Sequence, residues 1–263
     1  MIAQRINAER LVLLGWSRAI ALQMAHPLVA AGVADHSHFR AGPLEAATRL
    51  RETVRAMLAL TFGDPIAHGH AIAGIRAIHT RVHGRLRHPT GTFEAGTPYS
   101  AEDPALVLWV HATLIESVVL VYERLIAPLA PAERDQYCAE AADVAKALGA
   151  REEDLPRSWA ALEFYLAAEL TSGRIEVGAD ARAIIDAVLF PPLSWVSGPA
   201  AWINRLVTIG LLPDRIRAGY RYGWSDRRER QLRRVLAVLR AARHATPRVL
   251  AYWRPARVAG AGR

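Results

Sequence analysis

The sequence contains only one cysteine and only one lysine, and the single cysteine limits the covalent cross-links that the chain can form. Cys138 has no partner within the chain, so no internal disulfide can form. A lack of disulfides is typical of proteins from a reducing compartment. The first residues also lack the basic, apolar and small-residue pattern of a secretory signal, so we expect a cytoplasmic protein.

The chain also lacks linkers, internal repeats and runs of β-branched residues. No stretch rich in Gly, Ser or Pro divides its 263 residues, and this length is compatible with one hydrophobic core. Ala, Leu, Arg and Glu dominate, and these side chains lose little freedom in a helix. We therefore predict an all-α fold, a single-domain helical bundle over residues 1–263.

Long apolar runs free of polar residues are scarce. The most apolar stretch lies between Arg18 and Asp35, and it contains Gln23, His26 and Pro27. It is short for a membrane span, and polar groups in hydrocarbon are costly. The sequence predicts a buried helix there rather than a span.

Proline, glycine and capping residues set the predicted helix boundaries. Proline is tolerated in the first turn of a helix and breaks its interior, and glycine often ends one. Residues 85–100, rich in Gly, Pro and Thr, predict a loop or short hairpin. Helices are predicted, with approximate bounds, at 4–34 with a break or kink at Pro27, and at 43–60, 65–82, 104–125, 131–148, 155–171, 179–190, 197–211 and 226–243.

Several catalytic signatures are missing. The chain has no G-x-S-x-G elbow, no P-loop and no G-x-G-x-x-G, which argues against serine hydrolases of that type and against nucleotide-phosphate binding. It has no H-E-x-x-H, and no Glu is followed by His three residues later. Zinc proteases and di-iron carboxylate bundles are therefore poorly supported.

Ten histidines nevertheless suggest a metal or cofactor site. His79 and His83 are four residues apart, which would place both rings on one face of the predicted helix. His26 and His111 lie in strongly apolar segments, where an imidazole needs a hydrogen-bond partner or a ligand. A lone buried histidine is more often a hydrogen-bonded core residue than a ligand, so both interpretations stay open.

The charge is distributed unevenly along the chain. Residues 204–263 contain fifteen Arg and three acidic residues, a net +12, whereas the whole chain carries +8, so residues 1–203 sum to −4. The predicted helix 226–243 carries an apolar stripe that includes Leu232 and Leu236, with arginines over much of its remaining surface. Its arginines are either solvated or paired with acids from residues 1–203, or they attach the protein to an anionic membrane. We expect no specific nucleic-acid partner, because no aromatic residues alternate with this basic charge.

Five ordered sequence blocks resemble a known family. They span about residues 10–257, and their order makes them specific together although each is weak alone. The blocks are the run QMAHPLVAAGVADHS at 23–37, Arg49-x-x-x-Thr53 followed by Phe62-Gly63, Ile78-His79-Thr-Arg-Val82, Asp103-Pro104 followed by LWVHATL at 108–114, and Leu212-Pro213 with Arg217 and Tyr220.

The family is the bacterial one related to the fungal MpaB oxygenase and to rubber oxygenase (latex clearing protein). The resemblance implies a helical fold with a globin-like core and a haem b cofactor. It implies that His79 is the proximal iron ligand, that Arg49 and Thr53 act beside the haem, and that a distal acidic residue contributes, for which Asp35 is the candidate. The matching rubber-cleaving members carry a lysine next to that threonine, where this chain has Glu52.

The resemblance leads to our expectation for function. We expect a haem-dependent oxygenase that uses dioxygen on an apolar or lipid-like substrate, including oxidative cleavage of a carbon–carbon double bond. His111 and His26 are expected in the walls of the haem pocket because of their apolar flanks. Two alternatives stay open: a non-haem metal enzyme using His79 and His83, and a non-enzymatic protein that binds membrane or nucleic acid through its basic C-terminal segment.

Overall fold

The computed structural model is almost entirely helical and confirms the predicted all-α class. It describes residues 1–36, 43–190 and 198–260, without the side chains of 43–47, 49 and 50. The described α-helices are α1 (Ile2–Asn7), α2 (Leu13–Met24), α3 (Pro27–His36), α4 (Pro43–Phe62), α5 (Pro65–His79), α6 (Pro104–Leu125), α7 (Pro131–Ala147), α8 (Trp159–Thr171), α9 (Ala179–Leu189), α10 (Gly198–Leu211), α11 (Asp214–Gly219), α12 (Asp226–Ala245), α13 (Arg248–Ala251) and α14 (Arg254–Val258). Two short 3₁₀ turns, Arg10–Val12 and Glu152–Asp154, and the strands β1 (His83–Arg85) and β2 (Pro98–Ser100) complete the described elements.

Local capping explains where the helices around the central cavity begin. The Asp64 carboxylate accepts a hydrogen bond from the Ala67 N–H at 2.8 Å, and proline follows as the first residue of α5. Asp103 caps α6 in the same way through Ala105 N–H at 2.9 Å. Such caps satisfy backbone N–H groups that have no partner within the helix.

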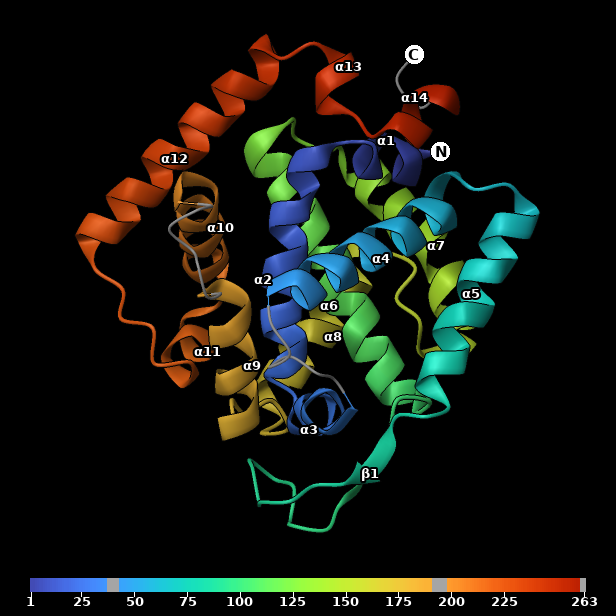
Figure 1. Cartoon of the computed structure of the whole chain (residues 1–263), viewed down its shortest axis with the longest axis vertical. Coiled ribbons are helices and arrows are strands. Elements are labelled where there is room, and N and C mark those ends of the chain that lie inside the picture. The colour runs from blue at the N-terminus through green and yellow to red at the C-terminus, as the bar shows by residue number, and fades with distance from the viewer. Residues whose placement is uncertain (37–42, 191–197, 261–263) are drawn as a thin grey trace.

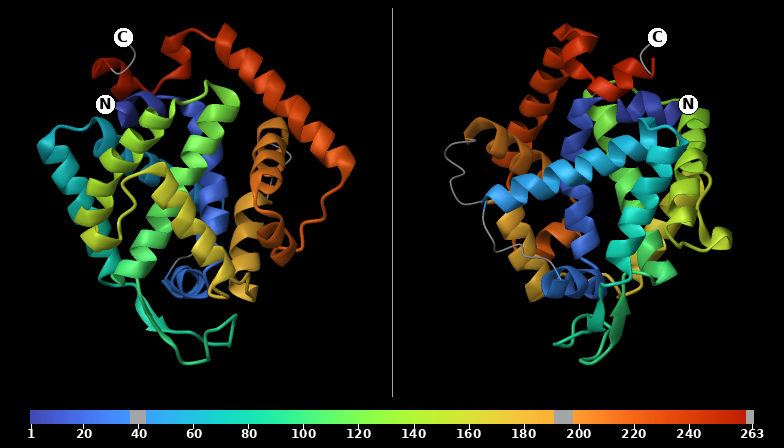
Figure 2. Two further views of the ribbon diagram at one scale, coloured as in Figure 1. Left: turned by 180° about the vertical axis from the view of Figure 1, so that it is seen from behind. Right: turned by 45° about the vertical axis from the view of Figure 1, so that its right-hand side comes forward.

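Helices α2 and α6 form the centre of the molecule and lie side by side (Figures 1 and 2). Their close approach depends on Gly15, because a Cβ at that position would lie 2.6 Å from the carbonyl oxygen of Ser117. Arg18, only 3% exposed, bridges this pair to α10. Its guanidinium pairs with Glu116 and donates to the Leu211 carbonyl at 2.7 Å.

The remaining helices surround this pair. Helix α4 crosses one side of it, with α5 beyond, and α7 and α8 cover the opposite side (Figures 1 and 2). Helices α9, α10 and α12 lie along a third side. One large cluster of buried side chains joins these layers, with members from α1 to α11 such as Ile6, Trp109, Leu162, Ile185 and Ile216.

Among the described helices, α6 is the one that is both long and strongly apolar. Pro104–Leu125 is long and apolar enough to cross a membrane by length and composition, and 67% of its most apolar window is buried inside the fold. The sequence analysis had assigned the most apolar stretch to residues 18–35, and the structure divides that stretch between α2 and α3. Pro27 is the first residue of α3, so the predicted break is confirmed.

Candidate functional site

A cavity of about 920 Å³ lies between α4 and α5 on one side and α6 and α7 on the other. Residues of α1, α2 and α3 complete its wall. The lining is mainly aliphatic, with Val29, Ile75, Val110 and Leu114 among its members. A cavity of this size and polarity is typical of sites for small molecules and cofactors.

His79 is the last residue of α5 and lines this cavity. Its Nδ1 atom is buried and has no hydrogen-bond partner among the described residues. Burial lowers the pKa of His79, and the nearby Glu102 partly opposes this effect. The ring is therefore neutral at physiological pH and retains a lone pair on one nitrogen, which is the form that binds metals.

His111 lines the cavity from the middle of α6. Burial lowers its pKa from 6.5 to about 4. No hydrogen bond to its ring is found among the residues that the structure describes, and part of the ring surface remains accessible from the cavity. Two neutral imidazoles, His79 and His111, thus belong to one apolar cavity.

His26 does not line the cavity. It precedes α3, and its Nδ1 atom accepts a hydrogen bond from the Leu28 N–H at 3.3 Å. Its ring packs at 5.3 Å from the ring of Phe93 and 6.4 Å from that of Trp109. Burial also lowers its pKa to about 4. In this arrangement His26 acts as a helix cap at the corner between α2 and α3.

The pairing of His79 with His83 on one helix face is not found. The prediction extended the helix to Val82, but α5 ends at His79 with Thr80 as its cap. His83 starts β1, is exposed and does not line the cavity. The helix ends early because residues 83–85 pair with 98–100 in a two-stranded sheet.

The structure gives partial information on the Arg49 and Thr53 block. The side chain of Arg49 lies outside the described residues. Thr53 is exposed on α4 and is not among the cavity-lining residues. One and two turns further along the same helix row, Met57 and Thr61 do line the cavity. The functional roles of Arg49 and Thr53 stay predictions.

Asp35 lies near the end of α3 and outside the cavity lining. Its carboxylate accepts a hydrogen bond from the Tyr99 hydroxyl at 2.6 Å and forms an ion pair with Arg87. Tyr99 itself lines the cavity, and burial together with this carboxylate raises the pKa of its phenol. Asp35 is thus connected to the cavity wall through Tyr99, and its catalytic role stays a prediction.

The sequence analysis did not identify two further histidines of the cavity wall. The His36 ring contacts the His83 carbonyl oxygen at 3.0 Å through Nε2, and the His68 ring contacts the Leu60 carbonyl oxygen at 3.1 Å through Nδ1. No local signal marks either position, because the cavity brings together helices far apart in the sequence.

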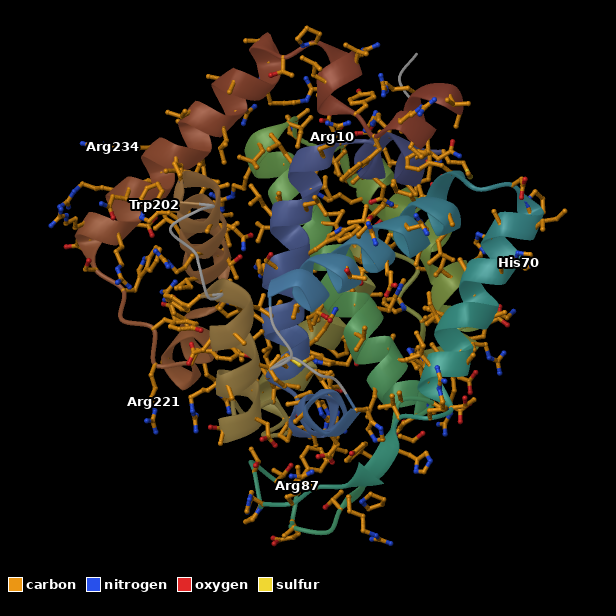
Figure 3. The ribbon with its side chains drawn as sticks, in the orientation of Figure 1. Arg10, His70, Arg87, Trp202, Arg221 and Arg234 are labelled. Carbon is orange, nitrogen blue, oxygen red and sulfur yellow. The ribbon has the colours of Figure 1, made fainter. Side chains whose placement is uncertain are left out.

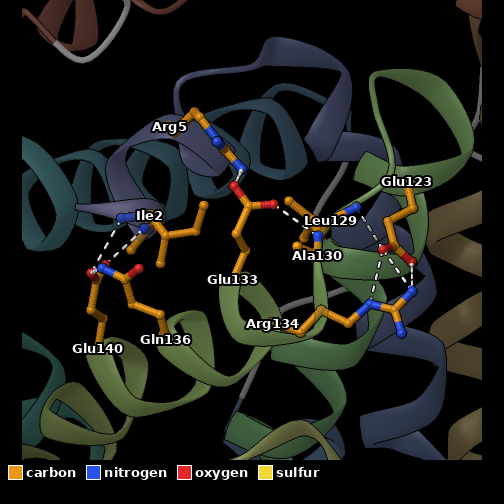
Figure 4. A network of polar contacts seen from close by, with 10 residues as sticks. Ile2, Arg5, Glu123, Leu129, Ala130, Glu133, Arg134, Gln136 and Glu140 are labelled. Atoms are coloured by element: carbon orange, nitrogen blue, oxygen red, sulfur yellow. Dashed lines mark hydrogen bonds and ion pairs between the residues drawn. The ribbon is translucent and has the colours of Figure 1, made fainter.

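Carboxylates provide a polar end to the cavity. Glu140 of α7 lines it and accepts hydrogen bonds from the backbone N–H groups of Ile2 at 3.2 Å and Ala3 at 2.8 Å (Figure 4). Arg5 pairs with Glu133 at 2.7 Å in the same network. These contacts fix α1 on α7 and close that end of the cavity.

Within residues 1–36, 43–190 and 198–260, no three His, Cys, Asp or Glu side chains come together in a way that could hold a metal ion. A metal in this part of the chain would therefore have at most two protein ligands from such side chains.

Comparisons with known proteins identify relatives of the chain and its family. The chain is 27% identical over 235 residues to the uncharacterized protein Mb2261 of Mycobacterium bovis and to the uncharacterized protein Rv2237 of Mycobacterium tuberculosis, which covers 87% of each chain. No solved structure matches the chain. Residues 3–241 match the family described as "ER-bound oxygenase mpaB/B'/Rubber oxygenase, catalytic domain". The chain therefore belongs to the MpaB and rubber oxygenase catalytic-domain family, a family of oxygenases.

Proposed function

We propose that this protein is a haem b-dependent oxygenase whose iron is bound by His79 and whose substrate is apolar. The observation that carries the proposal is the buried, unpartnered Nδ1 of His79 in the wall of a largely aliphatic cavity of about 920 Å³. An unpaired nitrogen in such a place costs free energy unless a ligand satisfies the ring. Membership in an oxygenase family supports the same reaction class.

The residues of the cavity fit a haem better than a bare metal ion. Haem iron takes four ligands from the porphyrin and needs only one or two from the protein. The described residues offer no cluster of three metal-binding side chains, and His83 lies outside the cavity. His79 is the candidate ligand, and His111 is the second imidazole in the same cavity. These features disfavour a non-haem site built on His79 and His83.

A bound haem would supply the binding and activation of dioxygen. The chain's own residues would set the conditions for that chemistry. Aliphatic side chains such as Val29, Ile75 and Leu114 exclude water and favour an apolar substrate. The Tyr99 phenol lines the cavity and donates its hydrogen bond to Asp35, so it connects that carboxylate to the cavity wall. Within the oxygenase class, the more specific proposal is a reaction that inserts oxygen into the apolar substrate and that includes oxidative cleavage of a carbon–carbon double bond.

Absorption spectroscopy of the purified protein with added haemin tests the proposal. Wild type should show a Soret band and one haem per chain, and His79→Ala should lose the band or bind haemin far more weakly. His83→Ala is the matched control, because that side chain is exposed and lies outside the cavity. It should bind haemin as wild type does.

The His111→Ala variant separates the two buried histidines. It should retain a Soret band, because the ligand is His79. If folded His79→Ala kept the wild-type spectrum while His111→Ala lost it, the assignment of the iron ligand would be wrong. If the folded wild type bound no haemin at all, the haem proposal itself would fail.

A further inference from the structure

The outward face of α12 carries exposed arginines that do not pack against the body of the protein. Its inward face packs through Leu232 and Leu236, which are buried against α6 and α10. The opposite row of the helix is exposed along its whole length. The row consists of Arg227, Arg230, Arg234, Ala237, Val238, Ala241 and Ala245.

Pairing with acids from the rest of the chain explains one arginine of α12 but not this row. Arg243 forms a bidentate pair with the buried Glu9, at 2.6 and 2.7 Å. Among the described residues, by contrast, Arg230 and Arg234 have no ion pair and no hydrogen bond through their side chains. The Arg234 side chain extends away from the body of the protein (Figure 3). The row itself contains no acidic residue.

Exposed aliphatic side chains follow these arginines along the chain, one within the row and two on α13. Val238 is 66% exposed, and Val249 and Leu250 of α13 are 53% and 62% exposed. Their exposure is not due to a detached segment, because the adjoining Ala251 and Tyr252 are buried. We call this surface, formed by the outward row of α12 with Val249 and Leu250, the α12–α13 face.

The backbone of this region is firmly held. Tyr252 pairs with Glu9 in an isolated β-bridge, and the Trp253 N–H donates to the Ala8 carbonyl at 3.0 Å. Tyr252 also belongs to a small apolar cluster that contacts Phe62 at the end of α4. The neighbouring Thr61 and Gly63 line the central cavity. The α13 end of the α12–α13 face therefore lies close to the α4 end of the cavity.

We propose that the α12–α13 face docks the protein on the surface of a membrane rich in anionic lipids. Guanidinium groups attract lipid phosphates and carboxylates, and exposed Val and Leu side chains beside them can enter the acyl boundary. A nucleic acid would use the charge but would gain nothing from exposed aliphatic residues, and no aromatic side chains alternate with these arginines. The inference does not depend on the presence of haem, because no cavity residue takes part.

Vesicle sedimentation with the full chain tests the proposal. One set of vesicles contains phosphatidylcholine alone, and the other contains phosphatidylcholine with phosphatidylglycerol. We expect binding to the second set at low ionic strength, weaker binding at moderate ionic strength because salt screens the charges, and little binding to the first set.

Charge-neutral variants identify the face. R230Q/R234Q should lower the partition coefficient about thirtyfold, which corresponds to about 2 kcal/mol for two arginines near an anionic surface. R76Q/R151Q is the matched control, since it removes the same charge from two exposed arginines, one on α5 and one shortly before α8. It should bind like wild type. Glutamine keeps the helix propensity of arginine, so folding should be retained.

An apolar variant separates a membrane from other anionic partners. L250S should weaken vesicle binding about tenfold, because the exposed Leu250 side chain would no longer be available to enter the acyl boundary of the membrane. F164S is its control, because Phe164 is 78% exposed on α8, away from this face. Equal binding to both vesicle types at low salt would overturn the proposal. So would equal losses in R230Q/R234Q and its control, or binding to an oligonucleotide that is stronger than to vesicles and insensitive to L250S.

Discussion

Replacing Arg243 tests how the C-terminal helices are held on the body of the protein. Its guanidinium forms two hydrogen bonds with Glu9, at 2.6 and 2.7 Å, and Glu9 is only 2% exposed. The Arg243→Met change leaves that carboxylate buried without a counter-charge. Breaking a buried pair by removing one partner costs about 3–5 kcal/mol, so we expect a loss of that size in the free energy of unfolding.

Urea denaturation followed by far-ultraviolet circular dichroism measures this loss. The matched control is Arg240→Met on the same helix, since Arg240 is exposed and an exposed substitution usually changes stability by less than about 0.5 kcal/mol. The double variant E9Q/R243M should recover most of the loss, because no unpaired charge remains.

The reasoning would be refuted by two outcomes. One is an Arg243→Met protein as stable as the Arg240→Met control. The other is a double variant less stable than Arg243→Met, because this would mean that packing around the methylene stem, rather than the unpaired Glu9 carboxylate, sets the cost.

Two further predictions concern the core and its histidines. Gly15→Ala should lower the melting temperature, with a cost of about 1–3 kcal/mol for overpacking against the Ser117 carbonyl. Gly74→Ala is the control and should be neutral or stabilising, because no neighbouring atom lies within 4 Å of the position of the added Cβ. A Gly15→Ala protein with wild-type stability would contradict the close contact between α2 and α6. Burial lowers the pKa of His26 and His111 in the folded protein from 6.5 to about 4. Between pH 6.5 and pH 4 the unfolded chain therefore binds protons that the folded chain does not bind, so the free energy of unfolding should fall as the pH falls through this range. For His26 the loss should reach about 2 kcal/mol by about pH 5, measured by urea titration, and His26→Asn should show a smaller slope with pH.

The fold could be predicted largely because its helix boundaries are set by local chemistry. Pro65, Pro104 and Pro131 each follow directly on the residue that caps a helix, and all three starts were predicted where the structure has them. Errors arose where a local signal competed with a tertiary one. The helix predicted at 65–82 ends at His79, because the following residues 83–85 pair with 98–100 in a sheet.

The short C-terminal helices illustrate what local patterns cannot show. No propensity predicts α13 or α14, which are four and five residues long. Their position depends on tertiary contacts such as the Trp253 N–H bond to Ala8. The same holds for the site. His79 and His111 were recognisable from their neighbours in the sequence, whereas His36 and Glu140 reach the cavity only because distant helices converge there.

The central position of α6 has a consequence for synthesis on the ribosome. Its Val121 and Leu125 are covered by Leu206, Leu232 and Leu236, of which the last two belong to α12. A nascent chain that has not yet completed α12 therefore presents an uncovered apolar surface on its own core helix, even though every residue of the cavity has already been made. Exposed apolar surface of this kind promotes aggregation and chaperone binding. We expect chains truncated before Asp226 to accumulate as insoluble or chaperone-bound protein, so that completion of the fold is coupled to nearly complete translation.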